Sequence, residues 1–231
     1  VPVLGIVSRM AEQKGFDLLQ PVLEPLLRQE AVQLIVLGSG QATTEDFFRW
    51  AAAKYPDRVG AYIGYNDALA HRIEAGSDCF LMPSHYEPCG LNQMYSLAYG
   101  TVPIVHRTGG LADTVHDWHE LGGQGNGFSF YEASPFALIT TIKRALAASH
   151  DLQLLKRIEQ YNRGVDSSSS TSTTSYYDYV RVLCLGQNEG IPQDMREHGS
   201  KKKALAAGLA TGDIDPTKGL VLIVQPTDYN A

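Results

Sequence analysis

Two basic residues and one acidic residue follow apolar runs of the sequence and could together hold a phosphorylated ligand. Arg9 and Lys14 flank the turn after the run Val3–Val7, and Glu87 follows the run "CFLMP". An arginine fork and a lysine point charge can bind a diphosphate, although two solvated charges would look the same. Glu87 could contact sugar hydroxyls or stabilise positive charge at a sugar carbon. It could equally be a helix-start acid favoured by the helix dipole, so both interpretations stay open.

Glycines precede two of the segments that have helical patterns. Gly90 stands before the predicted helix Leu91–Tyr99, and Gly109 with Gly110 stands before "LADTV". The first turn of a helix offers free amide donors and a positive dipole end, which suits a phosphate. In a doubly wound fold, glycines at such positions can also serve close packing alone.

The elements that must position these residues alternate regularly along the chain. Short, almost wholly apolar runs predict strands, and segments with helical periodicity lie between them. The predicted strands are Val3–Val7, 32–40, 58–65, 78–84, 101–106 and 125–130, and the predicted helices are Phe16–Leu27, Thr44–Lys54, Asp67–Ala75, Leu91–Tyr99 and Ser134–Ala148, the last with Ser134-Pro135 as its capped start. This alternation indicates an α/β fold with a Rossmann-like, doubly wound parallel sheet covered on both faces. Such sheets bind ligands beyond the carboxyl ends of their strands.

The composition excludes several classes of protein and partner. The chain has 231 residues, is 44% hydrophobic and carries a formal charge of −6, which argues against nucleic acid as its main partner. Its three cysteines favour free thiols in a reducing compartment. We expect no membrane span, because no apolar run approaches about 18 residues. "HDWHE" offers two histidines without a clear third ligand, so we expect no metal.

The pattern weakens after Ala148. "DSSSSTSTTS" is of low complexity, and little can be assigned from Gly186 onward. We therefore predict a domain over residues 1–182 and a C-terminal extension over 183–231 with no assigned role. Because "VPVLGIVSRM" begins within a strand pattern, we also expect that an upstream part of the protein is missing.

Three stretches together resemble the bacterial glycogen synthase and plant starch synthase family. They are "GIVSRMAEQKGFDLL", "GYNDALAHRIEAGSDCFLMPS" and "EPCGLNQMYSLAYGTVPIVHRTGGLADTV", and the resemblance extends over residues 1 to about 148. It implies the C-terminal, donor-binding half of a two-domain GT-B glycosyltransferase. That family transfers glucose from ADP-glucose to the non-reducing end of an α-1,4-glucan with retention of configuration and without a metal.

The resemblance also implies roles for particular residues. Arg9 and Lys14 would bind the diphosphate and stabilise it as it leaves, and Glu87 would hold the glucose and support an oxocarbenium-like transition state. Tyr65 would stack near the adenine. The remaining substrate-binding residues would be Cys89, Gly90, Leu91, Asn92, Thr108, Gly109 and Gly110. The implied partners are ADP-glucose or ADP, an α-1,4-glucan and the missing N-terminal domain, in the bacterial cytoplasm or, alternatively, the plastid stroma.

Three departures from the family pattern leave other functions open. The N-terminal domain with its lysine-glycine-glycine motif is absent, the serine-rich stretch replaces a tryptophan-containing segment, and His85 stands where the family usually has arginine. Because histidine is largely neutral at neutral pH, we expect a cation to be lost there. A non-catalytic nucleotide-binding subunit, or a GT-B enzyme that uses another sugar nucleotide, therefore remains as an alternative.

Overall fold

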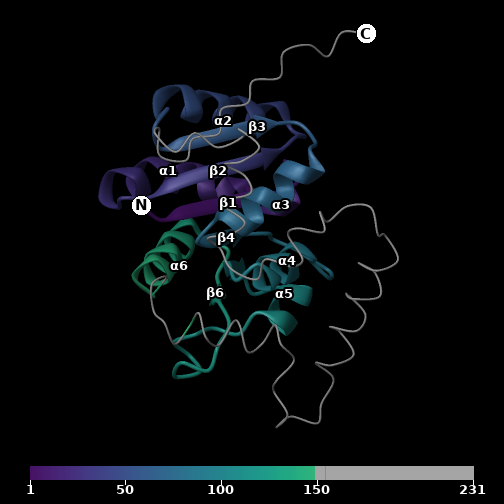
Figure 1. The fold of residues 1–231 in the computed structure, drawn as a ribbon, viewed down its shortest axis with the longest axis vertical. Coiled ribbons are helices and arrows are strands. Elements are labelled where there is room, and N and C mark those ends of the chain that lie inside the picture. The colour runs from purple at the N-terminus through teal and green to yellow at the C-terminus, as the bar shows by residue number, and fades with distance from the viewer. Residues whose placement is uncertain (149–153, 155–231) are drawn as a thin grey trace.

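The computed structural model describes residues 1–148 and Leu154, and in this part of the chain six parallel strands form one sheet (Figure 1). Their order in the sheet is β3-β2-β1-β4-β5-β6. The strands are β1 (Val3–Val7), β2 (Gln33–Gly38), β3 (Val59–Ile63), β4 (Cys79–Met82), β5 (Val102–His106) and β6 (Phe128–Phe130). The predicted extension over 183–231, and the end of the predicted domain, lie outside the described residues.

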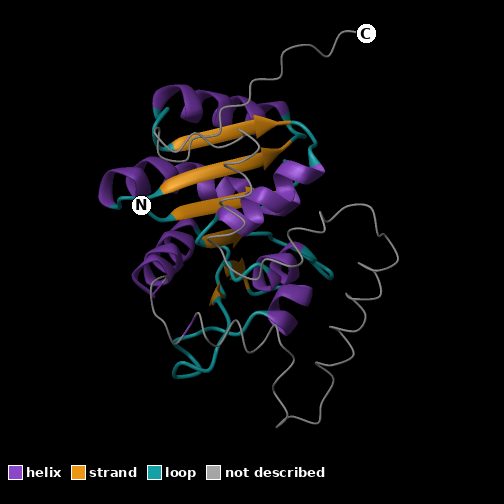
Figure 2. Ribbon diagram, in the orientation of Figure 1, coloured by secondary structure: helices purple, strands orange, loops and turns teal. Residues whose placement is uncertain are grey.

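Helices cover both faces of this sheet (Figure 2). They are the 3-10 turn η1 (Glu12–Lys14) and the helices α1 (Phe16–Gln29), α2 (Ala42–Lys54), α3 (Asp67–Gly76), α4 (Asn92–Ala98), α5 (Gly109–Thr114) and α6 (Pro135–Ala148). The predicted cap is present, because Ser134 Oγ accepts the Ala137 N–H at 3.2 Å. The predicted doubly wound parallel sheet is therefore confirmed.

Alternation along the strands explains why both faces need cover. In β1, Leu4 and Ile6 belong to the large core shared with α1, α2 and α6, whereas Val3 packs with Leu69 and Ile73 of α3. Successive strand side chains point to opposite faces, so both sets must be apolar when both faces are covered. This is why each strand appears in the sequence as a continuous apolar run.

The strand order creates a topological switch point at the centre of the sheet. From β1 the chain proceeds outward through β2 to β3, then returns to place β4 on the other side of β1 and continues to β5 and β6. The segments that follow β1 and β4 therefore lead away from each other and leave a crevice beyond their carboxyl ends. No helix among the described residues is long and apolar enough to cross a membrane.

Candidate functional site

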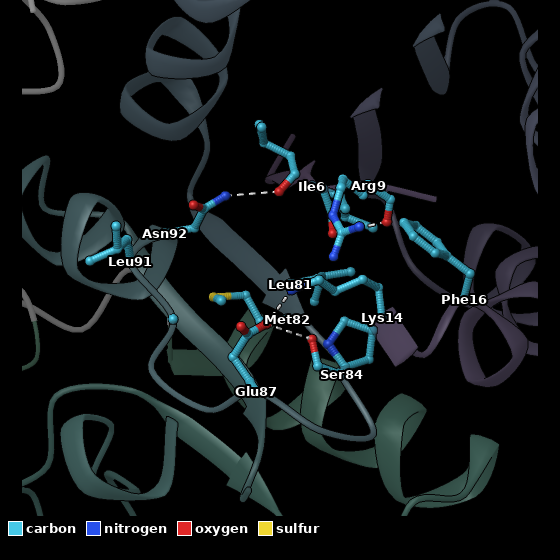
Figure 3. Close-up of a pocket in the computed structure, with 14 residues that line it drawn as sticks. Ile6, Arg9, Lys14, Phe16, Leu81, Met82, Ser84, Glu87, Leu91 and Asn92 are labelled. Atoms are coloured by element: carbon cyan, nitrogen blue, oxygen red, sulfur yellow. Dashed lines mark hydrogen bonds and ion pairs between the residues drawn. The ribbon is translucent and has the colours of Figure 1, made fainter. Parts of the chain in front are cut away.

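A cavity of about 180 Å³ lies at the switch point, beyond the ends of β1 and β4 (Figure 3). The segment after β1 forms one wall, and the loop between β4 and α4 forms the other. The lining residues are Ile6, Val7, Ser8, Arg9, Lys14, Phe16, Leu81, Met82, Pro83, Ser84, Glu87, Gly90, Leu91 and Asn92. The cavity thus has an apolar floor from the strands and a polar rim from the loops.

Lys14 and Glu87 face each other across this cavity. Lys14 Nζ lies 2.5 Å from Glu87 Oε2, and the two side chains are only 17% and 11% exposed. Ser84 Oγ donates a second hydrogen bond to the same Oε2 at 3.3 Å. For Oε1, the other carboxylate oxygen, the described residues supply no recorded donor. One side of the carboxylate is therefore held by the protein, and the other is left for a ligand.

The turn after β1 brings Lys14 to this position. Gly15 ends η1 in the left-handed region, at φ 71°, and its N–H donates to Glu12 O at 3.1 Å. A Cβ on Gly15 would lie 1.9 Å from Pro83 O. Only glycine permits both the backbone conformation and this close approach to the segment after β4. The glycine therefore sets the spacing between the lysine and the carboxylate.

Backbone hydrogen bonds fasten the acidic loop to the same turn. His85 N–H donates to Gln13 O at 2.9 Å, and Gln13 Nε2 donates to Tyr86 O at 2.9 Å. The His85 ring lies 2.8 Å from Asp17 Oδ1 and does not line the cavity. The expected loss of a cation at His85 stays a prediction, and the ring contacts Asp17 of α1 rather than the cavity.

Gly109 and Gly110 pack against the other side of the acidic loop. Gly110 N–H donates to Glu87 O at 3.0 Å, and a Cβ on Gly109, whose φ is 45°, would lie 2.1 Å from that same oxygen. Neither glycine lines the cavity, nor does Thr108, the N-cap residue of α5. The packing interpretation of these glycines thus has direct support, and contact with a ligand stays a prediction.

The start of α4 is tied to β1 and to its own preceding loop. Asn92 Nδ2 donates to Val7 O at 2.8 Å. Gln93, fully buried, places Nε2 at 3.1 Å from Cys89 O, Gly90 O and Thr114 Oγ1. Sequence reasoning missed Gln93 and Ser84, because their partners are carbonyl and carboxylate oxygens that the sequence pattern does not reveal.

The structure brings together six of the eleven residues predicted for the site. Those that line the cavity are Arg9, Lys14, Glu87, Gly90, Leu91 and Asn92. Cys89 is exposed, and Tyr65, 84% exposed, follows β3 at the edge of the sheet. Tyr65 is thus separated from the cavity by the whole width of β2. Its proposed stacking on a base stays a prediction.

A family model described as "Glycosyl transferases group 1" matches residues 1–165. The chain belongs to this family. The match includes all the cavity-lining residues, so the switch-point cavity lies entirely within the part of the chain that matches the family model.

Named relatives of this glycosyl transferase domain agree with the resemblance found in the sequence. A glycogen synthase of Anaeromyxobacter dehalogenans is 50% identical over 187 residues, which span 81% of this chain and 39% of the relative. Starch synthase IV from Arabidopsis thaliana, solved with ADP and acarbose, superposes with a TM-score of 0.65 at 28% identity over 81% of this chain and 39% of that one. The chain thus spans about two fifths of the length of these relatives.

A third comparison supports the fold. The C-terminal domain of a glycosyl transferase group 1 family protein from Francisella tularensis matches with a TM-score of 0.53 at 17% identity, over 72% of this chain and 85% of that domain. This likeness agrees with the prediction of a Rossmann-like half of a GT-B glycosyltransferase.

A second buried carboxylate, Asp117, does not line the cavity. Its Oδ1 accepts the His119 N–H at 3.0 Å, its Oδ2 accepts the Ser129 N–H at 2.8 Å, and the Arg144 guanidinium contacts each oxygen at 3.2 Å. Burial by itself would raise the pKa of Asp117, but the Ser129 N–H and Arg144 lower it below its usual value. Both oxygens are therefore committed to the protein.

A third buried carboxylate, Glu74 of α3, lacks such partners. Burial and the nearby Asp67 raise the pKa of Glu74 to about 8, and its Oε2 has no hydrogen-bond partner among the residues that the structure describes. His71 Nδ1 lies 3.7 Å away, but burial lowers the pKa of His71. Both shifts favour the uncharged form of the group, which disfavours an ion pair between Glu74 and His71. Among the described residues, no group of three or more potential ligands is placed to hold a metal ion.

Proposed function

We propose that this chain is the donor-binding domain of a glucan synthase that transfers glucose from ADP-glucose to the non-reducing end of an α-1,4-glucan with retention. The observation that carries the proposal is the Lys14–Glu87 pair at the switch-point cavity, with Arg9 on the same rim. The names of the Anaeromyxobacter and Arabidopsis relatives, the second of them solved with ADP, support this choice of donor and acceptor.

Arg9 and Lys14 supply the charge that a diphosphate requires. Both line the cavity, and the described residues provide no recorded side-chain partner for Arg9. When the bond between the glucose carbon and the diphosphate oxygen breaks, negative charge grows on the leaving group, and two fixed cations stabilise it. On this proposal no metal cofactor is needed, because these side chains take the role that a divalent cation has in other phosphate sites.

Glu87 serves the sugar, and donor binding changes its partner. In the structure Lys14 Nζ contacts the Glu87 carboxylate. A diphosphate that takes over Lys14 leaves Ser84 on Glu87 Oε2, and the carboxylate, no longer paired with a cation, meets glucose hydroxyls or positive charge at the sugar carbon.

The cavity accommodates part of the donor, and the missing domain would complete the site. Ligand pockets usually enclose about 300–1,000 Å³, more than this cavity provides. We place the diphosphate and glucose in the cavity and the adenosine over the ends of β1 and β2, in the direction of Tyr65. The glucan and an N-terminal GT-B domain would close the open side, in a bacterial cytoplasm or in a plastid stroma.

Calorimetric titration of the chain with ADP, ADP-glucose and UDP-glucose tests the proposal. We expect ADP and ADP-glucose to bind and UDP-glucose to bind at least about tenfold more weakly. A preference for UDP-glucose would instead assign another sugar nucleotide. If the folded chain binds none of them, the donor-site assignment fails for this chain. Joining the chain to the upstream domain and measuring glucan elongation then tests the transfer step.

A further inference from the structure

His106, the last residue of β5, presents both ring nitrogens to backbone carbonyls. Nδ1 lies 2.8 Å from Ser84 O, and Nε2 lies 3.2 Å from Tyr131 O. The side chain is buried and stacks on Phe130, with ring centroids 5.2 Å apart and an interplanar angle of 29°. The ring thus joins the loop after β4 to the segment after β6, on either side of β5.

The chemistry of the partners fixes the role of the ring. A carbonyl oxygen only accepts hydrogen bonds, so a ring nitrogen that bonds to one must carry a proton. A neutral imidazole donates from one nitrogen only. The shorter contact places that proton on Nδ1, toward Ser84 O. Nε2 carries a proton toward Tyr131 O only when both ring nitrogens are protonated.

Ser84 connects this histidine to the carboxylate of the site. Ser84 is almost fully buried, and it starts the loop that carries Glu87. Its carbonyl is held by His106, and its hydroxyl donates to Glu87 Oε2 at 3.3 Å. We propose that His106 is a positioning residue, which fixes Ser84 through an Nδ1–H···O bond and thereby aims the Glu87 carboxylate at the donor sugar. This rests on the proposed function, because it takes Glu87 as the group that meets the sugar.

The charged neighbours of His106 belong to a separate cluster. Arg107 Nη1 donates to Tyr131 Oη at 2.9 Å and lies 3.5 Å from Glu120 Oε2. Tyr131 Oη donates to that carboxylate at 2.9 Å, which raises the pKa of Tyr131. These groups are satisfied by one another. The Nδ1 side of the ring, by contrast, leads only to Ser84 and through it to the Lys14–Glu87 pair.

Three substitutions separate the two ring nitrogens. The amide nitrogen of asparagine can take the place of Nδ1, and that of glutamine can take the place of Nε2. His106→Asn therefore keeps the donor toward Ser84, His106→Gln removes it and places a donor toward Tyr131 instead, and His106→Leu has neither. All three lose the stacking on Phe130 to a similar extent, so a role in packing alone would not distinguish them.

The first readout needs no ligand. Amide hydrogen exchange should be measured at two bonds that hold the acidic loop, His85 N–H to Gln13 O and Gly110 N–H to Glu87 O. We expect exchange at both amides to be about fivefold to tenfold faster in His106→Leu and His106→Gln, and close to the parent chain in His106→Asn. Nitrogen NMR of the ring should show a proton on Nδ1.

The second readout links the residue to the sugar. In calorimetric titrations we expect His106→Leu and His106→Gln to bind ADP-glucose about fivefold to tenfold more weakly, while ADP affinity stays within about twofold. His106→Asn should retain both affinities. Equal effects on ADP and ADP-glucose would overturn the proposal, because they would indicate a general loss of structure.

Either readout can overturn the inference separately from the proposed function. If His106→Asn exchanges as fast as His106→Leu, or if Nδ1 carries no proton, His106 does not position the loop through Ser84. If the parent chain binds no nucleotide, the proposed function fails, and the exchange measurement still decides whether His106 orders the loop.

Discussion

Glu87 and Asp117 are both buried carboxylates beside a cation, but they are held in different ways. Asp117 has backbone N–H donors and the Arg144 guanidinium on both of its oxygens. Glu87 has Lys14 and Ser84 on a single oxygen, and it lines a cavity. A carboxylate with every acceptor position committed stabilises a fold. One with a free oxygen and an exchangeable cation can meet a ligand.

The largest effect on stability should come from removing the cation that pairs with Asp117. Arg144→Ala leaves Asp117 charged and buried, and we expect it to lower the free energy of unfolding by about 3 kcal/mol in urea titrations at neutral pH. Arg49→Ala, which breaks the exposed pairs of Arg49 with Glu45 and Asp46, is the matched control and should cost less than about 1 kcal/mol. Similar losses of stability in both variants would show that the buried Asp117–Arg144 pair stabilises the fold no more than an exposed ion pair does.

Removal of the exchangeable cation should act on binding more than on stability. We expect Lys14→Ala to weaken ADP binding by about tenfold to a hundredfold, because a charge-assisted bond to phosphate is lost. Lys54→Ala is the control, since Lys54 Nζ also lies 2.5 Å from a carboxylate, Glu24 Oε1, but on the surface away from the cavity. Equal ADP affinities in the two variants would contradict the assignment of Lys14.

Glu74 sharpens the comparison, because it is a buried carboxylate with neither kind of partner. Its pKa is raised from 4.5 to about 8, so between these values the unfolded chain releases a proton that the folded chain retains. Stability should therefore fall as pH rises through this range, by roughly 2 kcal/mol between pH 5 and pH 7. Glu74→Gln should remove this part of the fall in urea titrations at the two pH values.

Asp117 should behave in the opposite sense. Because the folded-state pKa of Asp117 is lowered, its contribution to stability is complete above the usual aspartate pKa and is lost as the solution becomes acidic. If the stability of Glu74→Gln depends on pH as that of the parent chain does, Glu74 does not cause the predicted fall in stability with rising pH.

The smallest effect is expected at His85. Its ring contacts Asp17 on the surface of α1, outside the cavity. We expect His85→Ala to change ADP affinity by less than about twofold and stability by less than about 1 kcal/mol. A loss of ADP affinity comparable to that of Lys14→Ala would show that the ring reaches the donor.

The fold was predictable because its strands are buried on both faces. Short, almost wholly apolar runs mark the six strands, and the residues after them predict where a ligand binds. The order of strands in the sheet was not predicted. It places β1 beside β4, which brings Lys14 to Glu87. It also places β3, the strand that precedes Tyr65, at the edge of the sheet.

The supporting residues of the site were less predictable than its charged residues. Gln93 and His106 stand in a helix and a strand where side-chain burial explains the sequence equally well. Most of their partners are backbone carbonyls, up to 25 residues away for His106, which any residue type can provide, and Gln93 also donates to Thr114 Oγ1. Only the three-dimensional contacts reveal that these side chains hold the loop that carries Glu87.

The central claim is that the donor takes Lys14 away from Glu87, and one pair of titrations tests it most directly. Glu87→Gln removes the competing carboxylate, so it should bind ADP as tightly as the parent chain or up to about fivefold more tightly. It should bind ADP-glucose at least about tenfold more weakly, because the sugar loses its charged partner. Calorimetry of Glu87→Gln with both ligands would contradict the account if ADP binding weakened as in Lys14→Ala, or if ADP-glucose bound as in the parent chain.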